Sequence, residues 1–78
     1  MTFYIVQLAK PVNLFWSGKS WVKTKPARVE FYDPIKAAGV ARELAATSEH
    51  PVSIIDGFET AVLTVPGGRD PSVVRKLP

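Results

Sequence analysis

Aromatic and basic side chains alternate between Leu14 and Arg28. The candidate partner-binding residues of this segment are Phe15, Trp16, Lys19, Trp21, Lys23, Lys25 and Arg28. Tryptophan and arginine dominate the binding energy of many protein interfaces, so exposed rings here would anchor a protein partner. Nucleic-acid bases also stack on exposed rings while lysines follow the phosphate backbone, with about 1 to 3 kcal/mol for each stacked base. The segment is therefore a candidate surface for a protein or for a nucleic acid.

The same residues also have a purely structural interpretation. Trp16 and Trp21 flank Ser17-Gly18-Lys19-Ser20, and a hairpin with this turn would pair the two rings across its strands as core residues. Lysines on such a hairpin keep it soluble and its edges unpaired. The sequence leaves the binding and the structural interpretations open.

Ser17-Gly18-Lys19-Ser20 also shares residues with the end of a phosphate-binding loop. The full motif needs a glycine five residues before Gly18, where this chain has Asn13. It also needs a strand that leads directly into a helix, whereas this segment predicts a hairpin. We therefore expect no nucleotide-hydrolase site.

Groups for catalysis or metal binding are scarce. His50 is the only histidine and the chain has no cysteine, so a metal would need carboxylates from residues such as Glu49, Asp56 or Glu59 in a spacing without a known signature. No serine lies in a Gly-x-Ser-x-Gly nucleophile motif. We expect no catalytic residue, metal or cofactor, and a protein that is not an enzyme.

The sequence from Asp33 to Ser48 predicts the single helix of the domain, around which the other segments of the chain are organised. Its apolar stripe has helical spacing and comprises Ala37, Val40, Ala41, Leu44, Ala45 and Ser48. Asp33 is suited to accept a backbone hydrogen bond as N-cap, and Pro34 suits the first helical position because its missing N–H has no intrahelical partner. Gly39 falls on the outer face, where glycine costs roughly 0.5 to 1 kcal/mol relative to alanine.

The remaining segments predict strands. Apolar runs bounded by turn residues cover Phe3–Leu8, the two arms of the Asn13–Lys23 hairpin, Ala27–Tyr32, Val52–Ile55 and Phe58–Val65. Asp56-Gly57 predicts a tight hairpin between the last two. The fold prediction is α+β, with a single antiparallel sheet of about five strands and one helix packed on one face. Several strands are apolar on both faces, so the second face is a candidate interface, including one for a homodimer.

Length and composition set the remaining expectations. The 78 residues predict one compact domain over 1–68 and a short tail over 69–78, in which Asp70-Pro71 would cap a turn reaching Leu77.

Residues 1–29 carry five basic side chains and no acid, whereas residues 30–68 have a net charge of −4. No segment reaches the roughly 18 apolar residues that span a bilayer, and no basic start precedes an apolar run. We expect a soluble cytoplasmic protein without a membrane partner.

The order of motifs resembles a recurrent layout among short orphan proteins of bacteriophages and other mobile elements. The pattern consists of Trp16-x-Gly18-x-x-Trp21, Ala27-x-x-x-Phe31, Ala37-Ala38 and Ala41-x-x-Leu44, within residues 3–65. Proteins of that kind, anti-CRISPR and other anti-defence proteins among them, often lack enzymatic activity and bind a host protein or complex. The resemblance implies the cytoplasm of a bacterial host and carries over no functional residues.

The expected function is therefore non-catalytic binding that modulates a host protein or complex, including a nucleoprotein complex, as a phage inhibitor of host defence does. One alternative is a nucleic-acid-binding protein that uses Lys19, Lys23, Lys25 and Arg28 with Arg75 and Lys76 of the tail. A further alternative is a homodimeric structural or accessory protein.

Overall fold

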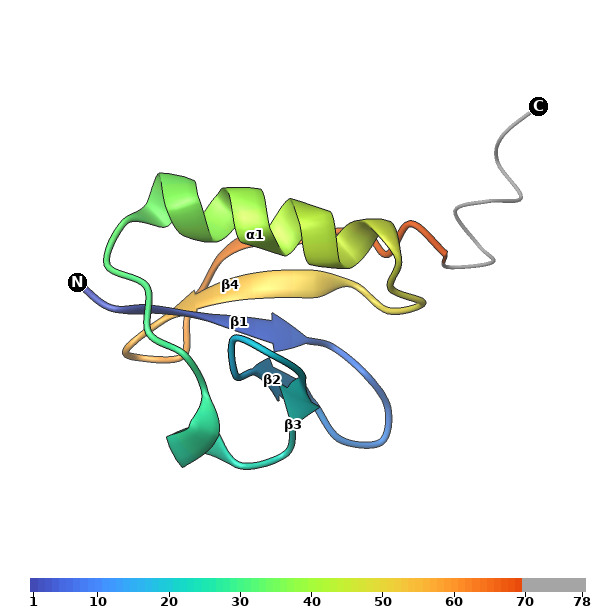
Figure 1. The fold of residues 1–78 in the computed structure, drawn as a ribbon, viewed down its shortest axis with the longest axis horizontal. Coiled ribbons are helices and arrows are strands. Elements are labelled where there is room, and N and C mark those ends of the chain that lie inside the picture. The colour runs from blue at the N-terminus through green and yellow to red at the C-terminus, as the bar shows by residue number, and fades with distance from the viewer. Residues whose placement is uncertain (70–78) are drawn as a thin grey trace.

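A computed structural model describes residues 1–69, which form a five-stranded antiparallel sheet with one α-helix on one face (Figure 1). The elements are β1 (Phe3–Gln7), β2 (Leu14–Trp16), β3 (Trp21–Val22), the 3-10 turn η1 (Lys25–Ala27), α1 (Pro34–Ala46), β4 (Val52–Asp56) and β5 (Ala61–Val65). This arrangement confirms the predicted α+β fold. The predicted turn that Asp70-Pro71 would cap, which reaches Leu77, lies outside the described residues.

β1 is the central strand of the sheet, whose order is β3-β2-β1-β4-β5. It pairs with β4 along its whole length, from Phe3 opposite Asp56 to Gln7 opposite Val52. Its other edge pairs with β2 only at Val6 and Gln7. Because side chains alternate across a strand, Ile5 faces α1 and Val6 faces away from it, and both are buried.

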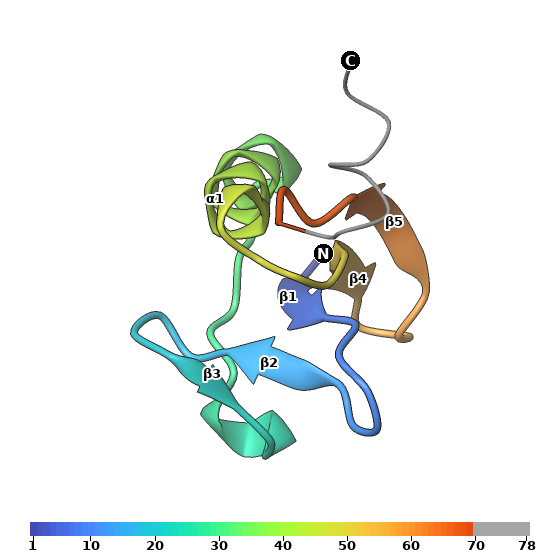
Figure 2. The same cartoon turned by 90° about the vertical axis from the view of Figure 1, so that its right-hand side faces the viewer.

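The helix begins and packs as its sequence predicts. The Asp33 carboxylate accepts a hydrogen bond from the Ile35 N–H over 2.9 Å, and Pro34 occupies the first turn. Ala37, Ala41 and Ala45 are buried against the sheet, because alanine allows the helix to lie close to it. The principal core consists of Phe3, Ile5, Ala37, Ala41, Ala45, Val52 and Ile54. Figure 2 shows α1 above β1 and β4, with the β2–β3 hairpin farther from the helix.

The chain after β5 returns to the C-terminal end of α1. The Gly68 N–H donates to the Ala45 carbonyl over 2.7 Å, and the Arg69 N–H donates to the Ser48 carbonyl over 2.9 Å. Buried Ser48 also accepts a hydrogen bond from the Gln7 side chain over 2.8 Å. The Gly68 bond gives one carbonyl of the last helical turn a donor from outside the helix.

The predicted strand over Ala27–Tyr32 is wrong. Pro26, which has no N–H to donate to a ladder, lies in η1, and the following chain meets the sheet only at single residues. Val29 donates to the Trp16 carbonyl over 2.9 Å, and Phe31 forms an isolated bridge with Phe3. The segment is a connection that crosses one edge of the sheet and reaches α1.

The last hairpin is confirmed, but its turn is longer than Asp56-Gly57 predicts. β5 begins at Ala61, and the Asp56 carboxylate accepts hydrogen bonds from the N–H groups of Phe58 and Thr60 over 2.9 and 3.0 Å. Glu59 adopts a left-handed φ of 62°, as the residue after a type I turn does in a three-residue hairpin loop. Phe58 therefore lies in the loop and not in the strand.

Candidate functional site

The sheet separates the aromatic residues of the Leu14–Arg28 segment. Trp16 and Trp21 pair across β2 and β3 on the helix side, where both are partly buried against the principal core. Their ring centroids lie 5.3 Å apart with an interplanar angle of 64°, an edge-to-face contact. Phe15 points to the opposite side and is buried there. The three rings therefore do not form one exposed platform.

The basic residues of the segment are also divided. Lys19 is exposed in the β2–β3 turn and Lys23 is exposed just after β3. Lys25 and Arg28, by contrast, lie on the side of the sheet away from α1, together with Phe15. The Arg28 guanidinium carbon lies 3.6 Å from the centre of the Tyr4 ring, a cation–π contact. Of the seven candidates, the structure thus brings Phe15, Lys25 and Arg28 together on one side of the sheet and pairs Trp16 with Trp21 on the other.

We refer to the side of the sheet away from α1 as the open face. A second apolar cluster lies on it, in which Val6, Phe15 and Ile55 are buried and Tyr4 and Val22 are partly buried. This cluster confirms that the sheet is apolar on both faces.

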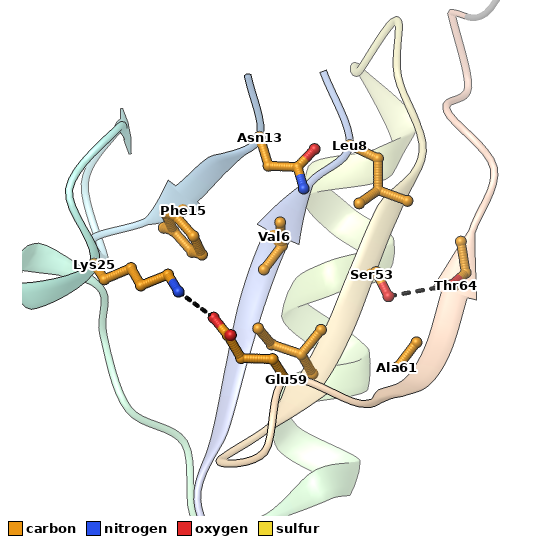
Figure 3. A pocket seen from close by; sticks show the side chains of 10 residues that line it. Val6, Leu8, Asn13, Phe15, Lys25, Ser53, Glu59, Ala61 and Thr64 are labelled. Atoms are coloured by element: carbon orange, nitrogen blue, oxygen red, sulfur yellow. Dashed lines mark hydrogen bonds and ion pairs between the residues drawn. The ribbon is translucent and has the colours of Figure 1, made fainter. Parts of the chain in front are cut away.

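A depression of about 420 Å³ indents the open face (Figure 3). Val6, Phe15 and Ile55 form its apolar floor, and Lys25 and Glu59 reach toward one another across it as an ion pair. Its other lining residues are Leu8, Asn13, Ser53, Ala61 and Thr64. We call this space the open-face depression.

Large apolar side chains are exposed at one end of the molecule, which we call the apolar end and define by Met1, Tyr32, Ile35 and Phe58. Their exposed fractions are 82%, 71%, 82% and 87%. Phe3 is bridged to Phe31 on one side and pairs with Asp56 on the other. The chain segments next to these three residues therefore lie at the same end of the molecule, and they carry Met1, Tyr32 and Phe58. Figure 1 shows the N-terminus, the start of α1 and the β4–β5 turn at this end.

Carboxylates surround the apolar end. Glu30 accepts a hydrogen bond from the Tyr32 hydroxyl over 2.6 Å, and this contact with the Glu30 charge raises the pKa of Tyr32. The ion pair with Lys25 lowers the pKa of Glu59 below its ordinary value, with a smaller contribution from Arg28. Asp33 and Asp56 cap the neighbouring backbone. This end therefore presents apolar surface among mainly acidic groups, with Lys36 beside Tyr32 and Asp33.

Sequence reasoning did not single out the apolar end. Ile35 lies outside the apolar stripe of α1, and Phe58 directly follows the Asp56-Gly57 turn. Apolar residues at such positions have no packing partner within their own element, and this signal could have identified both.

Within residues 1–69, no group of three or more histidine, cysteine, aspartate or glutamate residues is placed to hold a metal ion. No helix in the same range has the length and hydropathy needed to cross a bilayer. Comparisons of the chain with known protein families, with curated proteins and with solved structures find no match.

Proposed function

We propose that this chain is a non-catalytic binding protein that modulates a host protein or complex by docking its apolar end on it. The observation that carries the proposal is the exposure of Tyr32, Ile35 and Phe58 at 71% to 87% on one end of the fold. Single exposed apolar residues are common on protein surfaces, but a group of them marks an interaction site. Aromatic side chains are also enriched among the residues that dominate binding energy.

The charges around this end favour a protein partner over a nucleic acid. Glu30, Asp33, Asp56 and Glu59 are the neighbouring acids, and they outnumber the two neighbouring lysines, Lys36 and the Lys25 that is already paired with Glu59. A phosphate backbone would be repelled by such a rim. An apolar groove bordered by lysine or arginine would be complementary to it, and charge complementarity of this kind speeds association and excludes wrong partners.

The resemblance to anti-CRISPR and other anti-defence proteins of bacteriophages supports a role as an inhibitor in a bacterial cytoplasm. An inhibitor of this type needs no reactive group, because covering a functional surface of its target is sufficient. The standard interface buries about 800 Å² on each partner. The chain exposes 5291 Å² in total, so one end and its flanks suffice for such an interface.

The test is a pull-down from bacterial lysate with the wild-type chain and with a triple variant, Tyr32→Ser, Ile35→Ser and Phe58→Ser. All three side chains are exposed, so the variant should fold, and its circular dichroism and thermal melting check this. We expect a protein retained by the wild type at physiological salt and lost from the triple variant.

A matched control is Val12→Ser, which removes an exposed apolar side chain outside the apolar end. It should retain the partner. Loss of the partner from the control alone, or equal retention by all three proteins, would contradict the proposal. A wild-type dimer that the triple variant converts to a monomer would show instead that the partner is a second copy of the chain.

A further inference from the structure

The open-face depression has the features of a small-ligand site, and none of the residues that define the apolar end line it. Its volume of about 420 Å³ lies within the range of roughly 300 to 1,000 Å³ typical of ligand pockets. Val6, Phe15 and Ile55 supply an apolar floor and are at least nine-tenths buried. Ligand pockets typically combine such a floor with a few polar groups that fix orientation.

The polar groups of the depression differ in how fully they are already bonded. Ser53 donates to the Leu63 carbonyl over 3.1 Å and also shares a hydrogen bond of 3.1 Å with Thr64, so these hydroxyls mainly satisfy each other and the backbone. Lys25 and Glu59 are held only by their mutual ion pair, and both side chains are about half exposed. Their pair is therefore the polar contact that a ligand can replace most readily.

Two cations, Lys25 and Arg28, lie on this side of the sheet beside two carboxylates, Glu59 and Glu30. Lys25 lines a second depression of about 300 Å³ together with Tyr4, Pro26, Arg28 and Glu30. Among residues 1–69, one ion pair has its nitrogen and oxygen atoms within 4.0 Å of each other, and it is Lys25–Glu59. Arg28 therefore has no carboxylate oxygen of these residues within that distance. One guanidinium nitrogen of Arg28 is buried without a hydrogen-bond partner, an arrangement that needs an explanation in a folded protein.

Glu59 shows how a carboxylate sits at this position. Its backbone takes the left-handed φ of 62° and its side chain extends over the apolar floor to Lys25 (Figure 3). Lys25 and Arg28 both lower its pKa, so both cations favour a negative charge there. Glu59 thus occupies the place that the acid group of a ligand would take.

We propose that the open-face depression binds a small carboxylic acid with an aromatic or branched aliphatic body, with its carboxylate on Lys25 and its body on Val6, Phe15 and Ile55. Glu59 is then a built-in competitor for Lys25. This site is independent of the proposed docking of the apolar end.

The experiment follows the methyl resonances of Val6 and Ile55 by NMR while 3-phenylpropionate is added. A matched series uses neutral 3-phenylpropanamide, which has the same body without the charge. We expect saturable shifts with the acid and much weaker ones with the amide. Shifts that are equal for the two probes, or absent at Val6 and Ile55, would overturn the proposal.

Three variants test the roles of the charged groups. Glu59→Gln removes the competitor and should tighten binding of 3-phenylpropionate by about 2- to 5-fold, the effect expected for an exposed ion pair. Lys25→Met should weaken it by at least that factor, and Lys23→Met, a change at an exposed lysine outside the depression, should leave it unchanged. Weaker binding by Glu59→Gln, or unaltered binding by Lys25→Met, would contradict the assignment.

These outcomes are separate from those of the pull-down. The triple variant of the apolar end should still bind 3-phenylpropionate, and Lys25→Met should still retain the lysate partner. A common loss in both assays would show that the two sites are one.

Discussion

Gly68 donates its backbone N–H to the carbonyl oxygen of Ala45 over 2.7 Å and so joins the chain after β5 to the last turn of α1. The approach is so close that a Cβ atom on Gly68 would lie 2.5 Å from the Ala46 carbonyl oxygen. The neighbouring Gly67 is buried, and a Cβ atom there would lie 2.7 Å from the carbonyl oxygens of Ser48 and His50. This closure links the C-terminal end of α1 to the chain that follows β5, whereas the Asp33 cap at the other end is a local bond to Ile35.

Gly68→Ala should therefore destabilise the fold by about 1 to 3 kcal/mol, because the added Cβ would clash with backbone atoms of Ala46 and not with the end of a flexible side chain. The free energy of unfolding from urea titration measures the effect. Gly57→Ala is the control, since a Cβ there meets nothing within 4 Å, and it should change stability by no more than about 0.5 kcal/mol.

Gly39→Ala should have the opposite effect. Gly39 is exposed within α1 and a Cβ there also meets nothing within 4 Å, so alanine should stabilise the fold by roughly 0.5 to 1 kcal/mol. Urea titration measures the gain, and the pull-down should retain the same partner. A lost partner would mean that the outer face of α1 takes part in binding.

Two phenylalanine substitutions should distinguish a ring that packs in the fold from a ring that is exposed for binding a partner. Phe15→Ala removes a buried ring of the open face and should cost about 3 to 5 kcal/mol, whereas Phe58→Ala removes a ring that is 87% exposed and should cost less than about 0.5 kcal/mol. Thermal melting distinguishes them. If Phe15→Ala does not fold, Phe15→Leu should fold with a smaller loss, of less than about 1.5 kcal/mol.

Asp33→Ala should lower stability by about 1 kcal/mol, because the Ile35 N–H loses its acceptor. Asparagine accepts the same hydrogen bond, so Asp33→Asn should remain within a few tenths of a kcal/mol of the wild type. Chemical denaturation compares the three proteins. Equal losses in both variants would show that the charge, and not the cap, carries the effect.

The Lys25–Glu59 pair should be visible in a pH titration. The pKa of Glu59 lies below its ordinary value of 4.5, so the pair stabilises the fold above the unfolded-state pKa, and this stabilisation is lost as the pH falls through the folded-state pKa. NMR titration of the Glu59 carboxyl carbon measures the pKa. Lys25→Met should return it toward 4.5, and added salt should reduce the difference because the pair is exposed.

The elements that could be predicted from the sequence are those with local causes. Asp33-Pro34 starts α1 because the cap hydrogen bond and the fixed proline φ act within four residues of one another. Gly18 takes a φ of 96° in the β2–β3 turn, as the hairpin prediction requires. The predicted helical stripe is confirmed in part, since Ala37, Ala41 and Ala45 are buried, whereas Val40 and Leu44 are only partly buried against the core.

The predictions that failed depended on distant neighbours. Ala27–Tyr32 alternates like a strand, but a strand needs a free edge along its length, and β2 already occupies the β1 edge at Val6 and Gln7. Phe58 was assigned to β5 because the Asp56-Gly57 pair suggested a two-residue turn. The side chain of Asp56 instead holds a longer loop.

The sequence by itself determined the helix, the two hairpins and a sheet with two apolar faces, because periodicity and turn chemistry act over short distances. Only the tertiary structure decided the candidate sites. Alternation along β2 puts Phe15 and Trp16 on opposite faces, and the pairing of β1 with β2 decides that Phe15 is the one that faces away from α1. Three separate segments meet at the apolar end, namely the N-terminus with Met1, the start of α1 with Tyr32 and Ile35, and the β4–β5 turn with Phe58. Their meeting depends on strand register, which no local pattern specifies.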